Sequence, residues 1–436
     1  MYRYFLFILI YVSCFKLQAQ EEVLSLEDAI SIGLENNFSI IAAKNDNAIN
    51  EVNEEYKYAA LLPVLDITGR YNFQIENGEQ TFVDQDPRII DNAESNSLNG
   101  AATLTLNIFD GTRMFLNLRQ ADLELQQSNY ETQFALQNAV SQIAMAYFNL
   151  VYQSYQRSIL EDAVKLSETR YKIAKDKYEV GTSSKSDYLA ARVDLNTDQS
   201  SLISQNELLQ NAKVNLNMAI GRNPMSQVQA SDSIKINSYF NIDKLVNQLE
   251  QSNKALLAMK YEGKLLELEK NKVNTEWSPN IDAYAGYSYQ NLNSQAGFLI
   301  QNQSRGVNYG LSLNWTPFNK LDRSRRNELS QIQLDNNENN YNQLRNELQG
   351  SLYAAYIRFR NQIELVEIER NNTEVAKENA ELALDRFKVG RSNSLALREA
   401  QLNAVQAAGR LLNALYEAKL AEIEILRISG SAISEG

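Results

Sequence analysis

The sequence has no histidine and a single cysteine, Cys14, in 436 residues. Without histidine, a serine or cysteine nucleophile lacks its usual general base, and the commonest transition-metal ligand is missing. One cysteine cannot form a disulfide framework or a thiolate metal cluster within the chain. A glycine-rich phosphate-binding loop is also lacking. We therefore expect no enzyme, and no catalytic, cofactor-binding or metal residues.

The sequence also lacks a cluster of basic residues. The formal net charge is −12, with 42 Lys and Arg against 54 Asp and Glu. A protein of this charge has no patch to neutralise phosphates, which argues against a nucleic-acid partner.

No apolar stretch long enough for a transmembrane helix follows the first 20 residues. The start of the chain instead has the pattern of a signal peptide, residues 1–20: Arg3, an apolar run over 5–15, and cleavage after Ala19 or Gln20. The alternative is a lipoprotein signal, with Cys14 lipidated. Either signal predicts export, to the periplasm, the exterior or, as a β-barrel, the outer membrane.

Proline and glycine are scarce within the predicted helices. Segment 112–179 has neither, and 321–388 has only Gly350, which predicts two helices of roughly 100 Å. Shorter helices are predicted over 25–60, 184–219, 241–276 and 393–428. Three prolines mark the joins between helical and alternating segments: Pro63, Pro279 and Pro317.

The helices carry coiled-coil patterns. Apolar residues, many of them alanine, recur in steps of three and four from Leu397 to Ile425, which predicts closely packed helices. The same frame in 184–219 is interrupted by Asp198 and Gln205. The less favoured interpretation is an amphipathic helix on a globular core.

Four segments alternate with a period of two: 64–75, 100–109, 280–290 and 306–315. One face is apolar and the other polar, which is typical of transmembrane β-strands as well as of half-buried soluble sheets. The export signal and several aromatics on the apolar face favour the membrane: Tyr71, Phe73, Tyr287, Tyr289 and Trp315. Four strands cannot close a stable barrel, so we expect an oligomer, in which three chains supply twelve strands.

The chain is a tandem duplication. An offset of 216 residues carries Pro63 onto Pro279, and one of 209 carries Gly181 onto Gly390. Repeat 1 is predicted over 21–221 and repeat 2 over 241–430, with a linker at 222–240 and a tail at 431–436. The offset changes because repeat 1 has the longer loop between its strands, 76–99, and outer loops tolerate insertions that packed helices do not.

This order of elements resembles the TolC family of outer-membrane efflux proteins over about residues 24–430. The resemblance rests on one fragment at the first helix start, Leu26-Glu27-Asp28-Ala29, and on two repeated pairs: Leu62-Pro63 with Ser278-Pro279, and Tyr178-Glu179-Val180-Gly181 with Phe387-Lys388-Val389-Gly390. It implies a mainly α fold with a β portion, in which a trimeric twelve-stranded outer-membrane barrel continues into a periplasmic α-helical barrel. It also implies an exit duct of a tripartite efflux or type I secretion system, passive and gated at its periplasmic tip. The implied partners are outer-membrane lipid, a periplasmic adaptor and an inner-membrane RND or ABC transporter.

The resemblance places the periplasmic tip at the turns of Gly181 and Gly390, where glycine permits a left-handed helix C-cap. In the family, acidic residues just past the second turn line the aperture. Here the matching candidates are Glu399 and, in repeat 1, Asp187. Arg391 paired to Asp187 of a neighbouring helix is a candidate latch, and the alternative is a solvated surface charge.

The alternative function is a periplasmic coiled-coil adaptor or other structural protein of an envelope complex. An adaptor is expected to carry glycine-rich β segments around one hairpin, whereas this chain has two hairpins. The cargo, whether drug, metal ion or secreted polypeptide, is not specified, because specificity belongs largely to the inner-membrane transporter.

Overall fold

The computed structural model describes residues 22–81, 83, 86–236, 239–296 and 299–431. The predicted signal peptide, Cys14 and residues 432–436 of the predicted tail lie outside the described residues. The chain forms two compact units. One comprises residues up to 45, 131–255 and 344 onward, and the other comprises 46–130 and 256–343.

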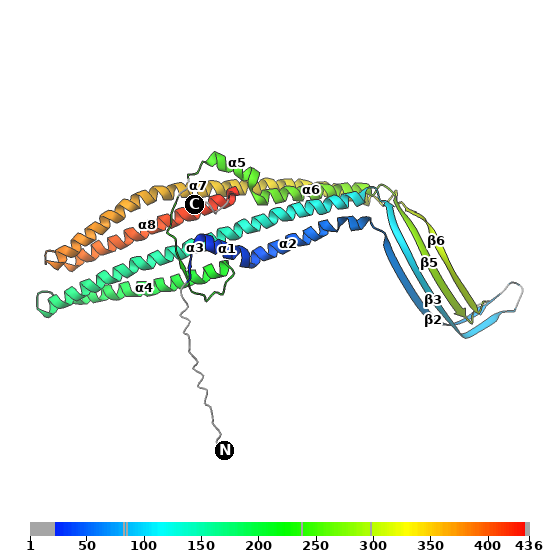
Figure 1. Cartoon of the computed structure of the whole chain (residues 1–436), viewed down its shortest axis with the longest axis horizontal. Coiled ribbons are helices and arrows are strands. Elements are labelled where there is room, and N and C mark those ends of the chain that lie inside the picture. The colour runs from blue at the N-terminus through cyan, green and yellow to red at the C-terminus, as the bar shows by residue number, and fades with distance from the viewer. Residues whose placement is uncertain (1–21, 82, 84–85, 237–238, 297–298, 432–436) are drawn as a thin grey trace, which may run out of the picture. The chain divides into compact units, whose positions relative to one another are not determined.

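The second unit contains a four-stranded antiparallel sheet in the order β2-β3-β5-β6 (Figure 1). The strands are β2 (Val64–Gln80), β3 (Arg88–Phe109), β5 (Asn280–Ser294) and β6 (Gln301–Asn314). The segments predicted to alternate lie in these strands, and their apolar face is open, with Ile67 and Tyr309 about four-fifths exposed, at 78% and 81%. Strands β2 and β6 each have an edge without a partner within the described chain.

The strands of repeat 1 are longer than the sequence pattern indicates. Most of the loop expected over 76–99 belongs to β2 and β3, which stay paired as far as Gln80 and Arg88, with an irregularity between Glu76 and Gly78. The polar composition of this segment suggested a loop. A ladder satisfies the backbone hydrogen bonds whatever the side chains, so polar residues continue it.

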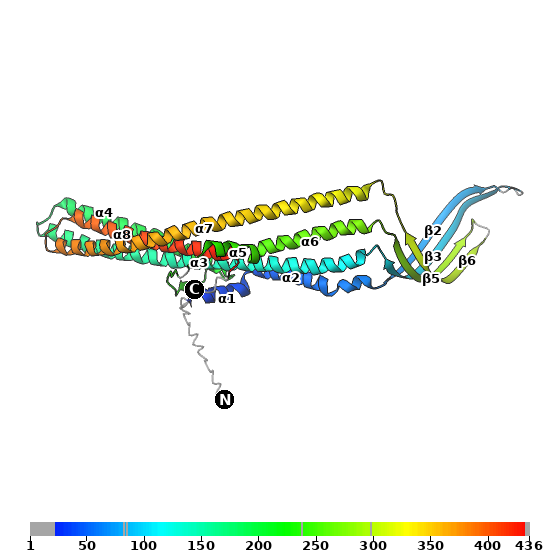
Figure 2. The same ribbon diagram turned by 90° about the horizontal axis from the view of Figure 1, so that it is seen from above.

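The helices of repeat 1 are α1 (Leu26–Asn36), α2 (Phe38–Glu55), α3 (Arg113–Glu179) and α4 (Lys185–Ala219), with a short 3-10 helix over Lys57–Leu61. Those of repeat 2 are α5 (Ile242–Ser252), α6 (Lys254–Thr275), α7 (Asp322–Lys388) and α8 (Ser394–Ser429). In the first unit α4 runs alongside α3, and α8 alongside α7 (Figures 1 and 2). Among the described residues, none of these helices combines the length and apolar character needed to cross a membrane.

Two segments expected as single helices, 25–60 and 241–276, are each divided at an asparagine. Asn37 ends α1 with an extended backbone, and its side-chain Nδ2 donates to the backbone oxygen of Ala219 at 2.8 Å. Asn253 does the same between α5 and α6, donating to the oxygen of Ile428 at 2.9 Å. Each asparagine thereby satisfies a carbonyl at the end of α4 or α8, a group that its own helix leaves without a partner. The break joins two shorter helices end to end.

The glycines that follow α4 and α8 complete the same joint. Gly221 and Gly430 have φ of +71° and +77°. A Cβ on Gly221 would lie 2.3 Å from the oxygen of Asn36, and one on Gly430 would lie 2.8 Å from the oxygen of Ser252. Both joints therefore need glycine for its conformation and for its size.

The core of the first unit lies where α3, α4 and α8 meet two short parallel strands, β1 (Glu22–Leu24) and β4 (Val228–Ala230). Tyr147 is fully buried there, and its hydroxyl donates to Asp232 Oδ2 at 2.6 Å and lies 3.0 Å from the backbone oxygen of Leu24. Burial raises the pKa of Tyr147 to about 12. The segment between the repeats is thus fastened to the first long helix.

Candidate functional site

The first tip joins α3 to α4 through a Schellman motif. The amide of Gly181 donates to the oxygen of Tyr178 at 3.0 Å, and that of Thr182 to the oxygen of Lys177 at 2.8 Å. Gly181 has a φ of +77°. These bonds satisfy carbonyls at the end of a long helix, so the chain reverses with few unpaired groups.

The second tip repeats this geometry at Gly390, whose φ is +74°. Arg391 N donates to the oxygen of Arg386 at 2.8 Å. A Cβ added to either tip glycine would meet nothing within 4 Å, so the dihedral angle alone accounts for glycine here. The tips also touch, because Lys177 Nζ donates to the oxygen of Phe387 at 3.0 Å and lies 4.3 Å from its ring centre.

Asp187 lies in the first turn of α4 and takes part in its N-cap. The hydroxyls of Ser183 and Ser184 donate to its Oδ2 at 3.0 and 2.8 Å, while its backbone amide donates to Ser184 Oγ at 3.1 Å. The bond from the Ser184 hydroxyl is the main cause of a pKa below the ordinary aspartate range. Asp187 is therefore an exposed carboxylate that stays ionised in mildly acidic solution.

Glu399 and Arg391 are both exposed. Within the part of the chain that the structure describes, neither side chain makes a hydrogen bond or an ion pair, and Arg391 is not joined to Asp187. The latch between Arg391 and Asp187 of a neighbouring helix stays a prediction. Among the described residues Arg391 has no competing partner, whereas Asp187 Oδ2 already accepts hydrogen bonds from Ser183 and Ser184.

The structure shows a charged cluster that the sequence did not predict. Arg398 of α8 makes two hydrogen bonds to Asp198 of α4, at 2.7 and 2.9 Å, and its Nε lies 3.7 Å from Asp194. Arg170 of α3 pairs with Asp194 from the other side. The cluster, defined as Arg170, Asp194, Asp198 and Arg398, links repeat 1 to repeat 2 above the tips.

Three of the four side chains of the cluster are largely removed from water, and that of Asp194 is 30% exposed. The side chains of Arg398 and Asp198 are each 13% exposed, and that of Arg170 only 1%. Burial lowers the pKa of Arg170 despite the bond to Asp194, whereas the bonds to Asp198 raise that of Arg398. Charges held this way are costly to separate, because each would be left buried without its partner.

One signal in the sequence pointed to this region. Asp198 and Gln205 interrupt the apolar seam of α4, and both are bonded to other helices. The hydroxyl of Ser167 donates to Asp198, and Gln205 Nε2 donates to Gln153 Oε1 at 2.7 Å. The interruptions are the places where α4 is fastened.

The three boundary prolines lie outside helices and strands. Pro63 and Pro279 each precede the first residue of a strand, and Pro317 lies between β6 and α7. Within the described residues, no group of three or more potential metal-ligating side chains occurs. The site thus consists of two contacting turns, exposed charges and an ion-pair cluster, an arrangement suited to holding helices together.

The sequence profile of outer membrane efflux proteins matches residues 29–222 and 245–431. The fold is similar to that of the CmeC outer membrane channel of Campylobacter jejuni, with a TM-score of 0.78, 15% identity, and 94% of this chain and 87% of that chain covered. VceC of Vibrio cholerae gives a TM-score of 0.74 at 14% identity, covering 94% and 97%. The open state of MtrE of Neisseria gonorrhoeae gives 0.73 at 15% identity, covering 93% and 89%. No curated protein sequence matches the chain.

Proposed function

The chain belongs to the outer membrane efflux protein family, and from this premise we propose that three copies assemble into the exit duct of a tripartite pump. Membership confirms the resemblance inferred from the sequence. The chain is an outer-membrane efflux channel. The proposal adds the trimer, a periplasmic adaptor and an inner-membrane transporter of the RND or ABC type, which supplies the energy.

The observation that supports the trimer is a sheet that is incomplete in one chain. The apolar face of β2 and β6 is open, with Val307 and Leu311 at least 70% exposed, and the outer edges of both strands are without partners among the described residues. Unpaired edges cannot lie in lipid, because the backbone groups would lose their hydrogen bonds. Pairing β6 of one chain with β2 of the next closes the sheet. An adaptor has no need of such a surface.

Disulfide trapping tests this closure. In a Cys14→Ser background, Thr68→Cys on β2 is combined in turn with Asn308→Cys, Gly310→Cys and Ser312→Cys on β6. We expect at least one combination to give a covalent trimer on a non-reducing gel of outer membranes, with each single variant as its control. If none of them yields trimers although the protein reaches the outer membrane, the proposed assembly is wrong.

We propose that the tip turns form the periplasmic gate, with Asp187 and Glu399 around the aperture and Arg391 as a latch to Asp187 of a neighbouring chain. Arg391 has no partner in its own chain, among the described residues, that would compete. In planar bilayers, Arg391→Ala is expected to raise the open probability of the trimer. Lys388→Ala, which removes an exposed pair with Asp385, is the matched control. An unchanged open probability in Arg391→Ala would overturn the latch.

The role in efflux is tested separately in cells. Deletion of the gene is expected to make the host retain the transported compound, and the wild-type chain is expected to restore export. Tip variants that trimerise normally but fail to restore export would identify residues needed for coupling to the adaptor. Normal export in the deletion strain would contradict the duct.

A further inference from the structure

A polar cavity of about 560 Å³ lies in the second unit, where the sheet meets the long helices. Its walls include Asn107, Asn280 and Asn314 from the ends of three strands, together with Arg113 at the start of α3 and Arg323 at the start of α7. Asn280 and Asn314 are paired across β5 and β6, and Asn107 donates to Asn280 Oδ1 at 2.6 Å. The cavity therefore opens on the polar face of the sheet. Its volume is in the range of small-molecule sites.

Arg323 is a buried cation with unused bonding capacity. It is 4% exposed, its guanidinium lies 4.9 Å from the ring centre of Trp277, and its Nη2 donates to the backbone oxygen of Thr316. Its Nη1 is buried and has no hydrogen-bond partner. A buried charged donor without an acceptor is costly, so the position favours an acceptor that the chain itself does not supply.

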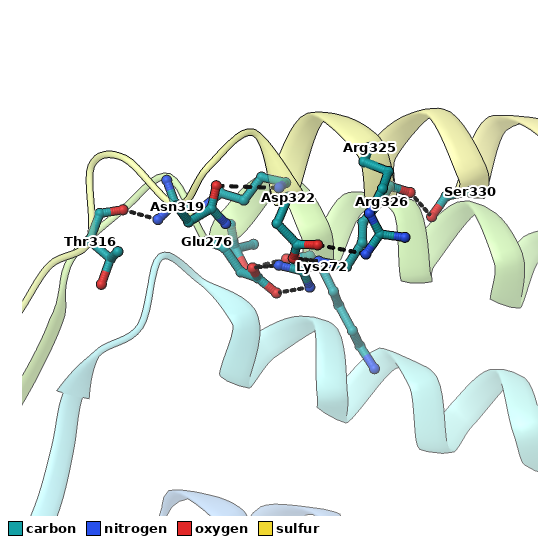
Figure 3. A network of polar contacts seen from close by, with 10 residues as sticks. Lys272, Glu276, Thr316, Asn319, Asp322, Arg325, Arg326 and Ser330 are labelled. Atoms are coloured by element: carbon teal, nitrogen blue, oxygen red, sulfur yellow. Dashed lines mark hydrogen bonds and ion pairs between the residues drawn. The ribbon is translucent and has the colours of Figure 1, made fainter.

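Two carboxylates also line the cavity, Glu276 and Asp110, and both already accept hydrogen bonds. Arg326 Nη1 donates to Glu276 Oε1 at 2.7 Å and its Nη2 to the other oxygen, and Arg326 Nε also bonds Asp322 at 2.8 Å (Figure 3). Asp110 Oδ1 accepts the amide of Met114 at 3.1 Å and so caps α3. In Figure 3, Glu276 and Asp322 converge on Arg326 at the junction of α6 and α7.

Among the described residues, the cations that line the cavity make no ion pair, although the pKa of Glu276, lowered mainly by its bond from Arg326, is lowered further by the charges of Arg113 and Arg323. Within the described residues the side chain of Arg113 makes no hydrogen bond or ion pair, and Arg323 bonds only a neutral carbonyl. The first turns of α3 and α7, two helices of 67 residues each, also border the cavity. Helix N-termini favour negative charge. The end of α6, at Thr275, lies on the same wall and opposes them in part.

We propose that this cavity binds a carboxylate or phosphate group through Arg113 and Arg323. Both anions accept paired hydrogen bonds from guanidinium groups, which a chloride ion cannot do. That the anionic group arrives from the lumen of a duct rests on the proposed function. The binding itself does not, so a failure of binding and a failure of export are separate results.

The chain carries its own probe for this test. It has two tryptophans, Trp277 and Trp315, and both lie at this junction, with Trp315 Nε1 donating to the oxygen of Trp277 at 3.1 Å. The full-length protein in a neutral detergent is titrated with sodium acetate and, separately, with sodium phosphate, and sodium chloride keeps the ionic strength constant. A saturable change in tryptophan emission is expected with at least one anion.

Variants assign the response to the two arginines. Arg323→Gln and Arg113→Gln are each expected to weaken binding at least about tenfold, as the loss of a charge-assisted hydrogen bond requires. Arg325→Gln is the control, because Arg325 bonds Asp322 at 2.6 Å and does not line the cavity. Arg113 is exposed, so its replacement reads out binding even if Arg323→Gln does not fold. No saturable response in the wild type, or an unchanged midpoint in Arg113→Gln, would overturn the proposal.

Discussion

Replacing Arg398 by methionine tests whether the charged cluster holds α8 against α4. The variant removes two hydrogen bonds, of 2.7 and 2.9 Å, from Asp198, whose side chain is 13% exposed. Leaving one member of a buried pair alone costs about 3–5 kcal/mol. The lower figure applies here, because Ser167 still donates to Asp198. We therefore expect a local destabilisation of about 3 kcal/mol.

Hydrogen exchange of the native protein measures this loss where it occurs. A local opening that is about 3 kcal/mol easier raises the exchange rate of the affected amides roughly 100-fold. The increase is expected in 190–202 of α4 and 394–405 of α8. Lys165→Met is the matched control, because its pair with Asp162 has a similar distance, 3.0 Å, but both side chains are more than 70% exposed. That pair is worth less than about 1 kcal/mol.

A double-mutant cycle then separates the interaction free energy of Arg398 with Asp198 from other effects of the two substitutions. Asp198→Leu alone is expected to cost about 2 kcal/mol, because Arg398 keeps its contact with Asp194 at 3.7 Å. The double variant is expected to cost about 2 kcal/mol, roughly 3 kcal/mol less than the sum of the single variants. If Arg398→Met exchanges no faster than Lys165→Met, or if the two changes add, the cluster does not fasten the helices.

Three further predictions concern the joints and the core. Asn253→Ala removes the hydrogen bond to the backbone oxygen of Ile428. Losing a buried hydrogen bond costs roughly 1–3 kcal/mol, so amide exchange at the end of α8 is expected to become about tenfold faster. Asn372→Ala, at an exposed position, is the control. Lys320 has a φ of +59°, so Lys320→Gly is expected to raise the thermal midpoint by relieving about 1 kcal/mol of strain, and an unchanged or lower midpoint would contradict that strain. Burial raises the pKa of Tyr147 to about 12, above an unfolded value near 10, so the folded state holds the proton more tightly. The contribution of Tyr147 to the free energy of unfolding is then constant below about pH 10 and falls by about 2 kcal/mol as the pH rises to about 12. In thermal melts at these pH values, Tyr147→Phe should lack this decrease, and an identical decrease in the variant would show that Tyr147 is not its cause.

The sequence predicted most of the architecture because its periodicities are long. Four heptads with an alanine-rich seam predict closely packed helices, and four alternating segments predict a small sheet, so few other fold classes fit this duplicated chain. The mainly helical fold with a small sheet is confirmed. Asn37 and Asn253 could not be recognised as breaks. Asparagine is tolerated within helices, and only the neighbouring end of α4 or α8 gives it a carbonyl to bond.

The charged cluster was hidden for a different reason. Asp198 in an apolar seam predicts a buried polar contact, but the partner, Arg398, is 200 residues away and belongs to the other repeat. Periodicity specifies which side of a helix is buried and says nothing about which helix covers it. The cavity beside Arg323 has the same origin, since its walls come from segments that are distant in the sequence.

The differences between the repeats carry a mechanical consequence. Asp198 and Gln205 of α4 correspond to Ala407 and Ala414 of α8, which are 1% and 4% exposed. Alanine contacts are lost as soon as two helices separate, because dispersion attraction weakens steeply once a gap of about 1 Å opens between the contacting atoms. The pair of Asp198 with Arg398 acts over a longer range, and both side chains are only 13% exposed, so separating them leaves two charges largely buried. Repeat 2 thus supplies close-packed walls, while the tie between the repeats is a set of largely buried charges that resists separation of α4 from α8.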